Sequence, residues 1–409
     1  MLGMGRAGIK RSHCPDFYST YHHLRSDSAS AMTSKQVPHF QAENPMKSAQ
    51  LFMTKGTGAM SYAENSNWHA MCMEKIWPTV LELVDSMKLP DDDMSIITIA
   101  DLGCAPGRNT INNVETVLKR VKERYRNGHI PEFQAFFQDL YDTDFNTLFQ
   151  LFKNSVATIA ENVPETLKYF PAGVPGSFYG RVFPRSSVHF VMSTFALHWI
   201  SKVPSSVLDK TSEDYNGGKI EHERASRATI DAYARQGDVD LRNFLDARVE
   251  EMATGGLMLL VFGVRKVYYP YCNTMVNEVK ERIWDELVSE GKVDSGLRGS
   301  FNNFMHFHYL KDVEQILNSY SEKLIVEKEY VFPFFLYPQN MTAREKAARH
   351  ASLNRGLYTS MLEDHFGEDI TNLYIARYEQ ALLEGFESGT LTEDETNTYQ
   401  FVAIVARKL

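Results

Sequence analysis

The chain has 409 residues, 43% hydrophobic and 23% charged, which is enough to bury the core of one elaborated α/β domain. Its formal net charge of −9 argues against a nucleic-acid partner, because phosphates require a basic face. No apolar run approaches the roughly 20 residues of a membrane span, and the four cysteines lack disulfide or zinc spacing. We therefore expect a cytoplasmic protein without a membrane partner.

The N-terminal part of the chain predicts a tail followed by alternating strands and helices. Residues 1–45 are polar without a sustained hydrophobic period, so we interpret them as a flexible tail ahead of a single domain over residues 46–409. Residues 95–103 form an apolar strand, and a helix with one apolar stripe follows, with Gly128 as its stop. A second strand is predicted over 131–140.

The middle of the chain continues this alternation. A second amphipathic helix is predicted over 144–161, a third strand over 186–197, a long helix over 230–252 and a fourth strand over 255–264. Strands that alternate with helices indicate the α/β class, with a doubly wound, mostly parallel sheet.

The last part of the chain is mostly helical. Residues 273–291 and 341–388 are charged helices, whereas 323–332 and 398–408 alternate as an antiparallel hairpin at a sheet edge would. Insertions of this kind predict an α-helical cap on the sheet domain. Its segments are expected at about 200–225, 266–310 and 336–390.

The strand-turn-helix over residues 99–109 is the strongest local motif. Asp101 ends the strand, and Gly103 and Gly107 would let the backbone approach a ligand at the carboxyl end of the sheet. The glycine spacing does not match the G-x-G-x-x-G of a dinucleotide site. A cationic, phosphate-free nucleotide fits better, with Asp101 on its ammonium and sulfonium end and Asp139 on its ribose. A tight turn without a ligand is the alternative that this motif alone leaves open.

Several separated blocks, in order, resemble the plant SABATH methyltransferases. The likeness runs from about Met53 to Leu409, and its blocks include MTKGTGAMSYAENS, IADLGCAPGRNT, FFQDLYDTDFNTLF, GVPGSFYGRVFP and STFALHWISKVP. That family methylates salicylate, benzoate, jasmonate, indole-acetate and related acids, or purine nitrogens of caffeine precursors. The resemblance implies a Rossmann-like class I methyltransferase that uses S-adenosylmethionine, belongs to plant specialised metabolism and is commonly a homodimer.

The resemblance also places a cofactor site. Asp139 would hold the ribose, Leu140 would pack on the adenine, and Ser177 and Phe178 would meet the adenine edge. The implied cofactor-binding residues are Ser66, Asp101, Asn109, Asp139, Leu140, Ser177 and Phe178.

The acceptor side contains one informative departure. The family grips the substrate carboxylate with a Trp, here Trp199, and often with a Gln at the position that is His69 in this chain. A neutral His can donate one hydrogen bond to a carboxylate, and a protonated one adds charge. Phe195 and His198 are expected to line the same pocket, with Tyr62 as a weaker candidate. The alternatives are that His69 points at solvent and that His198 and Trp199 only pack in the core.

Two other departures concern a basic residue and a metal. The basic residue expected before the glycines aligns with Thr54, with Lys55 one place later. Some members bind a metal through two Asn residues and an acid, which here correspond to Asn216, Asn302 and Gly299. Because a carboxylate is the usual anchor of a hard divalent cation, we predict no obligatory metal. The F-N-x-P-x-Y motif that includes Asn302 is also lost, which leaves the lid side undefined.

These observations predict transfer of a methyl group from S-adenosylmethionine to the carboxylate of a small acid. The aromatic content favours a planar acid such as cinnamate, benzoate or salicylate. A carboxylate has a pKa near ~4 and is already the nucleophile at neutral pH, so residues that position it suffice and no catalytic base is predicted. The alternatives are methylation of a purine nitrogen or a thiol, and a protein that binds a small acid without turnover.

Overall fold

The computed structural model of the chain places most of the predicted elements. The described residues are 53–55, 62, 66–90, 95–125, 130–152, 169–269, 275–333, 337, 340–392 and 400–409. The tail expected over 1–45 and the helix stop expected at Gly128 lie outside these residues.

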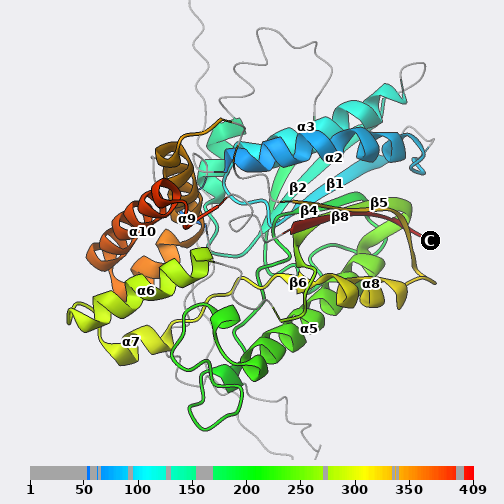
Figure 1. The fold of residues 1–409 in the computed structure, drawn as a ribbon. Helices are drawn as coiled ribbons and strands as arrows, with labels where there is room; N and C mark the ends of the chain where they lie inside the picture. The colour runs from blue at the N-terminus through cyan, green and yellow to red at the C-terminus, as the bar shows by residue number, and fades with distance from the viewer. Residues whose placement is uncertain are drawn as a thin grey trace, which may run out of the picture. The chain divides into compact units, whose positions relative to one another are not determined.

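A mixed eight-stranded sheet forms the centre of the unit that contains residues 49–409 (Figure 1). Its strand order is β3-β2-β1-β4-β5-β8-β7, with β6 paired to β5. Strands β1 to β6 pair in parallel, whereas β8 runs antiparallel between β5 and β7. The strands are β1 (Ile96–Leu102), β2 (Glu132–Asp139), β3 (Phe170–Pro175), β4 (Val188–Thr194), β5 (Met252–Arg265), β6 (His308–Tyr309), β7 (Leu324–Pro333) and β8 (Gln400–Lys408).

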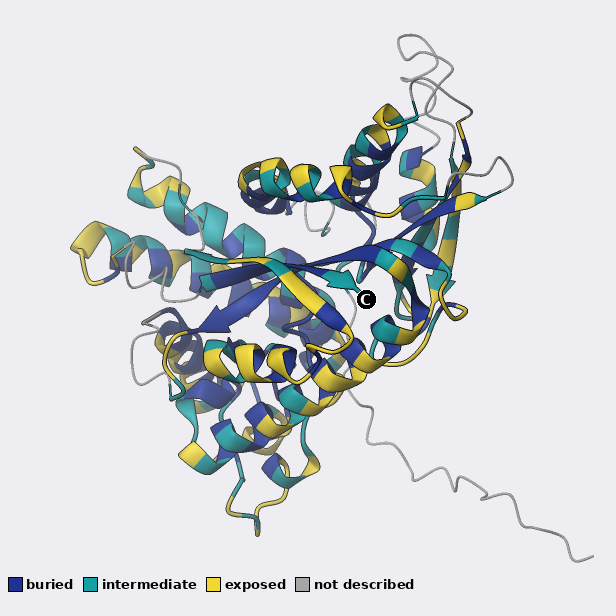
Figure 2. Cartoon of the chain, turned by 90° about the vertical axis from the view of Figure 1, so that its right-hand side faces the viewer, coloured by how far each residue is buried: buried dark blue, intermediate teal, exposed yellow. Residues whose placement is uncertain are grey.

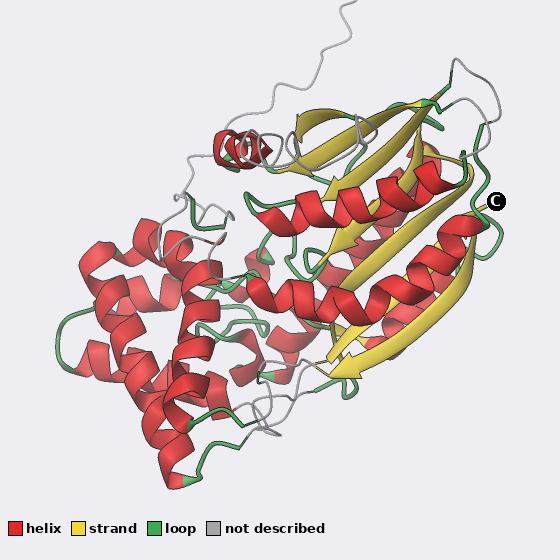
Figure 3. Cartoon of the chain, turned by 90° about the horizontal axis from the view of Figure 1, so that it is seen from above, coloured by secondary structure: helices red, strands yellow, loops and turns green. Residues whose placement is uncertain are grey.

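Helices cover both faces of this sheet (Figures 1 and 3). The helices are α2 (Asn67–Asp85), α3 (Arg108–Glu123), α5 (Arg227–Glu251), α6 (Met275–Ser289), α7 (Ser295–Ser300), α8 (Leu310–Asn318), α9 (Ala343–Phe366) and α10 (Glu368–Ser388). In β1, Ile97 and Ile99 pack with α2 and α3, whereas Ala100 and Leu102 pack with α5 and α8. This alternation is what a strand buried on both faces requires.

The parallel strands bring their carboxyl ends to one edge of the sheet. Asp101 of β1 lies opposite Phe137 of β2 and Met192 of β4, so β2 ends at Asp139 next to the end of β1. The turns that follow β1, β2 and β4 are therefore neighbours, as expected of a doubly wound sheet.

A second apolar cluster lies in the helical lobe, which consists of α6, α7, α9 and α10 (Figure 3). Trp284 stacks between Phe366 and Tyr374, with ring centroids 4.3 and 4.6 Å away. Gly367, at φ +85°, separates α9 from α10. Figure 2 shows that the strands are largely buried, whereas the helices carry exposed residues on their outer sides. Within the part of the chain that is described, no helix is long and apolar enough to cross a membrane.

The structure differs from the prediction in three places. The cap segment expected at 200–225 contains only two short 3-10 turns, η1 (Ser205–Val207) and η2 (His222–Arg224). Strand β3 was not predicted, because its prolines disfavour a strand except at the edge where it lies. Strands β7 and β8 do pair antiparallel, but β8 lies inside the sheet, and α9 and α10 separate it from β7 in the chain.

Candidate functional site

The turn between β1 and α3 is wound tightly around the end of β2. The N–H groups of Gly103 and Cys104 both donate to the carbonyl of Gln138, at 2.9 and 3.0 Å. Gly103 has φ +76° and Ala105 has φ +48°, so the chain turns through the left-handed region twice. A turn with this backbone and without bulky side chains is suited to the close approach of a ligand.

We expect Gly103→Ala to lower the free energy of unfolding measurably. A Cβ at this position would overlap the Cβ of Ala196 and lie 3.2 Å from Cε1 of Phe178. The left-handed backbone costs about 1–2 kcal/mol, and overpacking costs about 1–3 kcal/mol more. Gly389→Ala is the matched control, because Gly389 has φ +72° and a Cβ added there would meet nothing within 4 Å. If urea denaturation showed the same loss of unfolding free energy for both variants, the close approach of Ala196 to position 103 would not be the reason for the glycine.

Asp101 presents a buried oxygen without a donor. The residue is 2% exposed, and its Oδ2 accepts a hydrogen bond from Oγ1 of Thr110 at 2.5 Å. Its Oδ1 has no hydrogen-bond partner among the described residues. Burial raises the pKa of Asp101 to about 7. The hydrogen bond from Thr110 lowers this pKa, whereas the charge of Asp139 raises it. A cationic donor would satisfy this oxygen and favour its ionised form.

Asp139 is already fixed by three donors at the end of β2. Its Oδ2 accepts from the N–H of Ala105 at 2.7 Å, and its Oδ1 accepts from the N–H of Leu140 at 2.7 Å and Oγ1 of Thr143 at 2.8 Å. Burial raises the pKa of Asp139, although these three bonds lower it. A carboxylate has about four acceptor sites, so a rigidly held acceptor remains available to hydroxyl groups of a ligand.

The start of α2 is hydrogen-bonded to the start of α3. Nδ2 of Asn109 donates to the carbonyl and to Oγ of Ser66, at 2.9 and 3.1 Å. The same Nδ2 lies 3.4 Å from Nδ1 of His69, and the Tyr62 hydroxyl lies 3.0 Å from that ring nitrogen. Ser66, Asn109 and His69, predicted for two different parts of the site, are therefore neighbours.

His69 is buried and neutral. It is 5% exposed, so the alternative that it points at solvent is wrong. Its ring centroid lies 3.9 Å from that of Trp68 and 4.5 Å from that of Phe195. Burial, and to a lesser degree the nearby His198, lowers the pKa of His69 to about 3. A neutral imidazole has one N–H donor and one acceptor nitrogen, so His69 can donate a single hydrogen bond.

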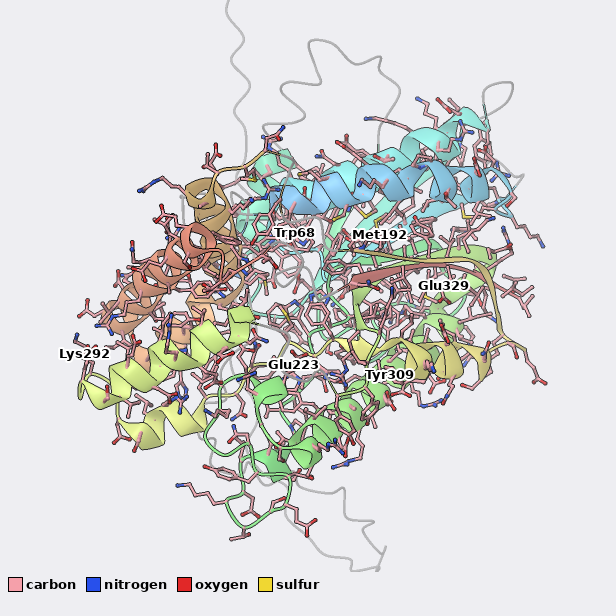
Figure 4. The ribbon with its side chains drawn as sticks, in the orientation of Figure 1. Trp68, Met192, Glu223, Lys292, Tyr309 and Glu329 are labelled. Atoms are coloured by element: carbon pink, nitrogen blue, oxygen red, sulfur yellow. The ribbon has the colours of Figure 1, made fainter. Side chains whose placement is uncertain are left out.

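Aromatic rings surround His69 where β4 ends. Phe195 has the positive φ of +61°, and its N–H donates to the carbonyl of Val261 at 2.6 Å. Its ring meets Trp68 and Phe401 edge-to-face, at 4.8 and 5.0 Å between centroids. Trp68 lies at the end of α2 that faces the helical lobe (Figure 4). A left-handed non-glycine residue is strained, and the Phe195 ring at this position packs against His69 and Trp68.

The segment around Trp199 pairs with the segment around Met305. Trp199 and Met305 form an antiparallel bridge, and the N–H of His306 donates to the carbonyl of His198 at 2.7 Å. The Trp199 ring packs edge-to-face on Tyr358 of α9, at 6.0 Å. This places Trp199 between the sheet edge and the helical lobe.

His198 itself is held by the sheet. Its Nδ1 accepts from the N–H of Gly263 at 3.2 Å, and its ring stacks on Phe307 with centroids 5.4 Å apart. Burial, with a smaller contribution from His308, lowers the pKa of His198 to about 3. These contacts agree with the alternative that His198 packs in the core. That His198 lines an acceptor pocket stays a prediction.

Ser177 and Phe178 follow β3 on a loop that approaches the β1 turn. Ser177 is exposed, and its Oγ accepts from the N–H of Tyr179 at 3.3 Å. Phe178 is half-buried and packs edge-to-face on Tyr179 and Phe244, with centroids 4.7 and 5.8 Å apart. The contact described above between a Cβ at position 103 and Phe178 shows that this loop reaches the turn.

The sequence analysis missed the ion pair that fixes this loop. Arg248 and Glu251 of α5 are both fully buried and pair at 2.7 Å. The guanidinium donates to the carbonyls of Phe178 and Gly180 at 3.0 Å, and Glu251 accepts from the N–H groups of residues 182–183 at 2.5 and 3.0 Å. An Arg-x-x-Glu spacing in a helix reads as a solvated pair, so no local signal revealed its burial.

The residues at which this chain departs from the family pattern also have defined contacts in the structure. Oγ1 of Thr54 donates to the carbonyl of Arg355 at 3.4 Å, which places Thr54 against α9. Nδ2 of Asn216 donates to Oδ1 of Asn302 at 2.5 Å, so the two amides bond each other. Within the described stretches, no group of three or more His, Cys, Asp or Glu side chains could hold a metal ion. The absence of an obligatory metal stays a prediction.

The fold and this edge define a Rossmann-like methyltransferase. A solved structure described as loganic acid methyltransferase with SAH superposes with a TM-score of 0.76 and 28% identity, over 87% of this chain and 98% of that one. The sequence profile of the SAM-dependent carboxyl methyltransferases matches residues 48–408. The chain belongs to this family, the plant SABATH methyltransferases.

Two relatives from Arabidopsis thaliana illustrate the match. Gibberellic acid methyltransferase 2 is 38% identical over 267 residues, 61% of this chain and 66% of that protein. Indole-3-acetate O-methyltransferase 1 is 35% identical over 346 residues, 80% of this chain and 89% of that protein. S-adenosylmethionine is the cofactor, and the unpartnered, buried Oδ1 of Asp101 fits a cofactor that carries an ammonium group.

Proposed function

We propose that this enzyme methylates the carboxylate of a small, planar aromatic acid. The observation that carries the proposal is the neutral His69, enclosed by aromatic rings on the same edge as Asp101 and Asn109. A neutral donor between ring faces fits an acceptor with an anionic end and a flat apolar body. The relative named for indole-3-acetate supports the same class of acceptor.

On the cofactor side, we assign Asp101 to the ammonium group and Asp139 to the ribose of S-adenosylmethionine. Their carboxylates lie at the ends of adjacent strands, one with a free oxygen and the other held by three donors. Ser66 and Asn109 join the two helix starts beside them. Leu140, Ser177 and Phe178 would then pack around the adenine.

On the acceptor side, the residues orient the carboxylate rather than activate it. Bound S-adenosylmethionine supplies an electrophilic methyl group on sulfur. The acid is ionised at neutral pH, and the ring N–H of His69 and the indole N–H of Trp199 would hold one oxygen in line. Phe195 and Trp68 would exclude water. Orientation of this kind can supply roughly 7–11 kcal/mol of the barrier reduction.

The proposal is tested with labelled S-adenosylmethionine and a panel of acids, a xanthine and a thiol. We expect transfer to benzoate, salicylate or cinnamate, or to indole-3-acetate. Exclusive transfer to the xanthine or the thiol would favour the alternative acceptors. Transfer to no compound, with cofactor binding intact, would favour a protein that binds a small acid without turnover.

We expect His69→Gln to change the ranking of acids in that panel. Glutamine keeps a donor but removes the ring that contacts Trp68 and Phe195. Aromatic acids should lose about 3–10-fold in kcat/KM relative to an aliphatic acid, the range of one neutral contact of about 0.5–1.5 kcal/mol. His365→Gln in α9 is the control, because its ring contacts Phe301 and Phe366 instead. An unchanged ranking in both variants would remove His69 from the acceptor site.

A cytoplasmic location and a homodimer stay predictions, as does the absence of nucleic-acid and membrane partners. Cys72 and Cys104 are buried free thiols, which supports a reducing compartment. Size-exclusion chromatography with light scattering tests the oligomeric state.

A further inference from the structure

A chain of polar contacts connects α6 to Trp199 through the interior of the helical lobe. It starts at Lys280 of α6, whose Nζ pairs with Oε1 of Glu221 at 3.0 Å. Both residues are buried, at 8% and 7% exposure. Glu223, two residues after Glu221, belongs to the 3-10 turn η2 that precedes α5, and Figure 4 labels it near that helix. A buried charge pair of this kind must be held by further partners.

Asn303 extends the contacts toward the site. Its Nδ2 donates to Oε2 of Glu221 at 3.1 Å and to the hydroxyl of Tyr358 at 3.2 Å. Its Oδ1 accepts from the N–H of Met305 at 2.9 Å. Asn303 lies in the segment where the F-N-x-P-x-Y motif is lost, at a position that the motif leaves unspecified, and its amide is buried.

The contacts end at the hydroxyl of Tyr358. This hydroxyl accepts from Asn303, and its own proton is donated to the Sδ atom of Met305 at 3.4 Å. A thioether is a weak acceptor, so the hydroxyl proton of this buried phenol forms only a weak hydrogen bond. An oxygen brought to the same position would form a stronger bond and displace the sulfur contact.

Lys280 increases the donor strength of Tyr358. Its Nζ lies 5.1 Å from the centroid of the Tyr358 ring, within range of a cation–π contact. Burial raises the pKa of Tyr358 to about 12, while the charge of Lys280 lowers it. The phenol therefore stays protonated at neutral pH, and the cation withdraws electron density from its ring. Both effects favour a hydrogen bond from Tyr358 to an oxygen.

Tyr358 lies directly against Trp199, with their ring centroids 6.0 Å apart. Trp199 and Tyr358 belong to the apolar cluster of the helical lobe, whereas Trp68 and Phe195, which contact His69, belong to the cluster of the sheet. An acid whose carboxylate is held by Trp199 would therefore have Tyr358 as a neighbour.

We propose that the Tyr358 hydroxyl binds a second oxygen of the acceptor, so that the preferred acid carries a hydroxyl or carbonyl group away from its carboxylate. Lys280, Glu221 and Asn303 are positioning residues for this contact. The inference rests on the proposed carboxyl methylation and narrows its substrate class.

The test compares cinnamate with 2-, 3- and 4-hydroxycinnamate, measured as kcat and KM for the complete chain. Wild type should prefer at least one hydroxycinnamate by about 3–10-fold in kcat/KM, mainly through KM, as expected for one neutral hydrogen bond. Tyr358→Phe should bring this ratio close to one and leave the value for cinnamate within about twofold.

Two further variants provide a control and a change in the opposite direction. Tyr378→Phe should leave the ratio unchanged, because the Tyr378 hydroxyl is buried in the same lobe without a partner among the described residues. Met305→Leu conserves the side-chain volume and removes the sulfur that competes for the Tyr358 proton, so the preference for the hydroxylated acid should increase.

The possible failures are distinguishable. If wild type methylates cinnamate and all three hydroxycinnamates equally, or if Tyr358→Phe lowers every rate by the same factor, the second-oxygen contact is wrong and carboxyl methylation stands. If wild type methylates no acid in this set or in the wider panel, the proposed function is wrong and the inference is withdrawn with it.

Discussion

Replacing Arg248 with methionine should lower the free energy of unfolding by about 3–5 kcal/mol, the usual result of removing one partner from a buried ion pair. The variant leaves the Glu251 carboxylate uncompensated at zero exposure and removes the donors to the carbonyls of Phe178 and Gly180. Because these carbonyls belong to the loop predicted to contact the adenine, affinity for S-adenosylmethionine should fall as well. Urea denaturation and calorimetric titration measure the two effects.

The control for this variant lies on the same loop. Arg181 pairs with Glu250 at 3.0 Å, but both side chains are more than 40% exposed. An exposed pair contributes about 0–1 kcal/mol, so Arg181→Met should change neither stability nor cofactor affinity substantially. If Arg181→Met and Arg248→Met were equally destabilised, the burial of the Arg248–Glu251 pair would not be what stabilises the loop.

Asp101→Asn should weaken S-adenosylmethionine binding by about 10–100-fold. The substitution keeps the size of the side chain but exchanges a charge-assisted hydrogen bond, worth about 1.5–3 kcal/mol, for a neutral one. Isothermal titration calorimetry at pH 7.5 measures the change. Undiminished affinity would show that the unpartnered Oδ1 does not face the cofactor.

The pH dependence of binding provides a second measurement on the same residue. Burial raises the pKa of Asp101 to about 7, so the ligand-free carboxyl group is increasingly protonated as the pH falls below that value. A cationic ligand prefers the ionised form, and wild type should lose affinity between pH 8 and pH 6, whereas Asp101→Asn should show a flat profile. Asp238→Asn is the control: burial raises the pKa of Asp238 to about 6, but the charges that act on it are those of Asp312, Arg242 and Arg265 rather than those of the cofactor site, so the wild-type profile should persist.

The raised pKa of Asp101 affects the stability of the ligand-free protein in the opposite direction: stability falls as the pH rises, whereas affinity for the cofactor increases. The folded-state pKa of Asp101 lies above the unfolded value near ~4. This group therefore contributes most stability below that value, and the contribution is lost as the pH rises through 7. Stabilisation by S-adenosylmethionine in thermal unfolding should accordingly be greater at pH 7.5 than at pH 5.5.

Local patterns predicted β1, α3 and β2 well. The run that ends at Asp101 is apolar on both faces, and the helix after it has a single apolar stripe, so each element could be recognised from its own residues. The two acids at the ends of β1 and β2 are brought together simply because the strands are parallel neighbours.

Features that depend on distant partners were missed. Arg248 and Glu251 look solvated in their own helix, and only the loop over 177–183 buries them. Asn303 and Lys280 lie far apart in the chain and meet only when the helical lobe is formed. The burial of His69 likewise depends on Phe195 and Asn109, which come from two later turns.

The interior position of β8 has a consequence for how the chain folds. Residues 400–407 fill the gap between β5 and β7, although β5 ends at Arg265 and both long helices of the lobe intervene. Until β8 inserts, two strand edges remain unsatisfied and open to pairing with other chains. Pairings with such large sequence separation form slowly. Sheet closure should therefore be the late step of refolding, and low protein concentration during that step should determine the yield.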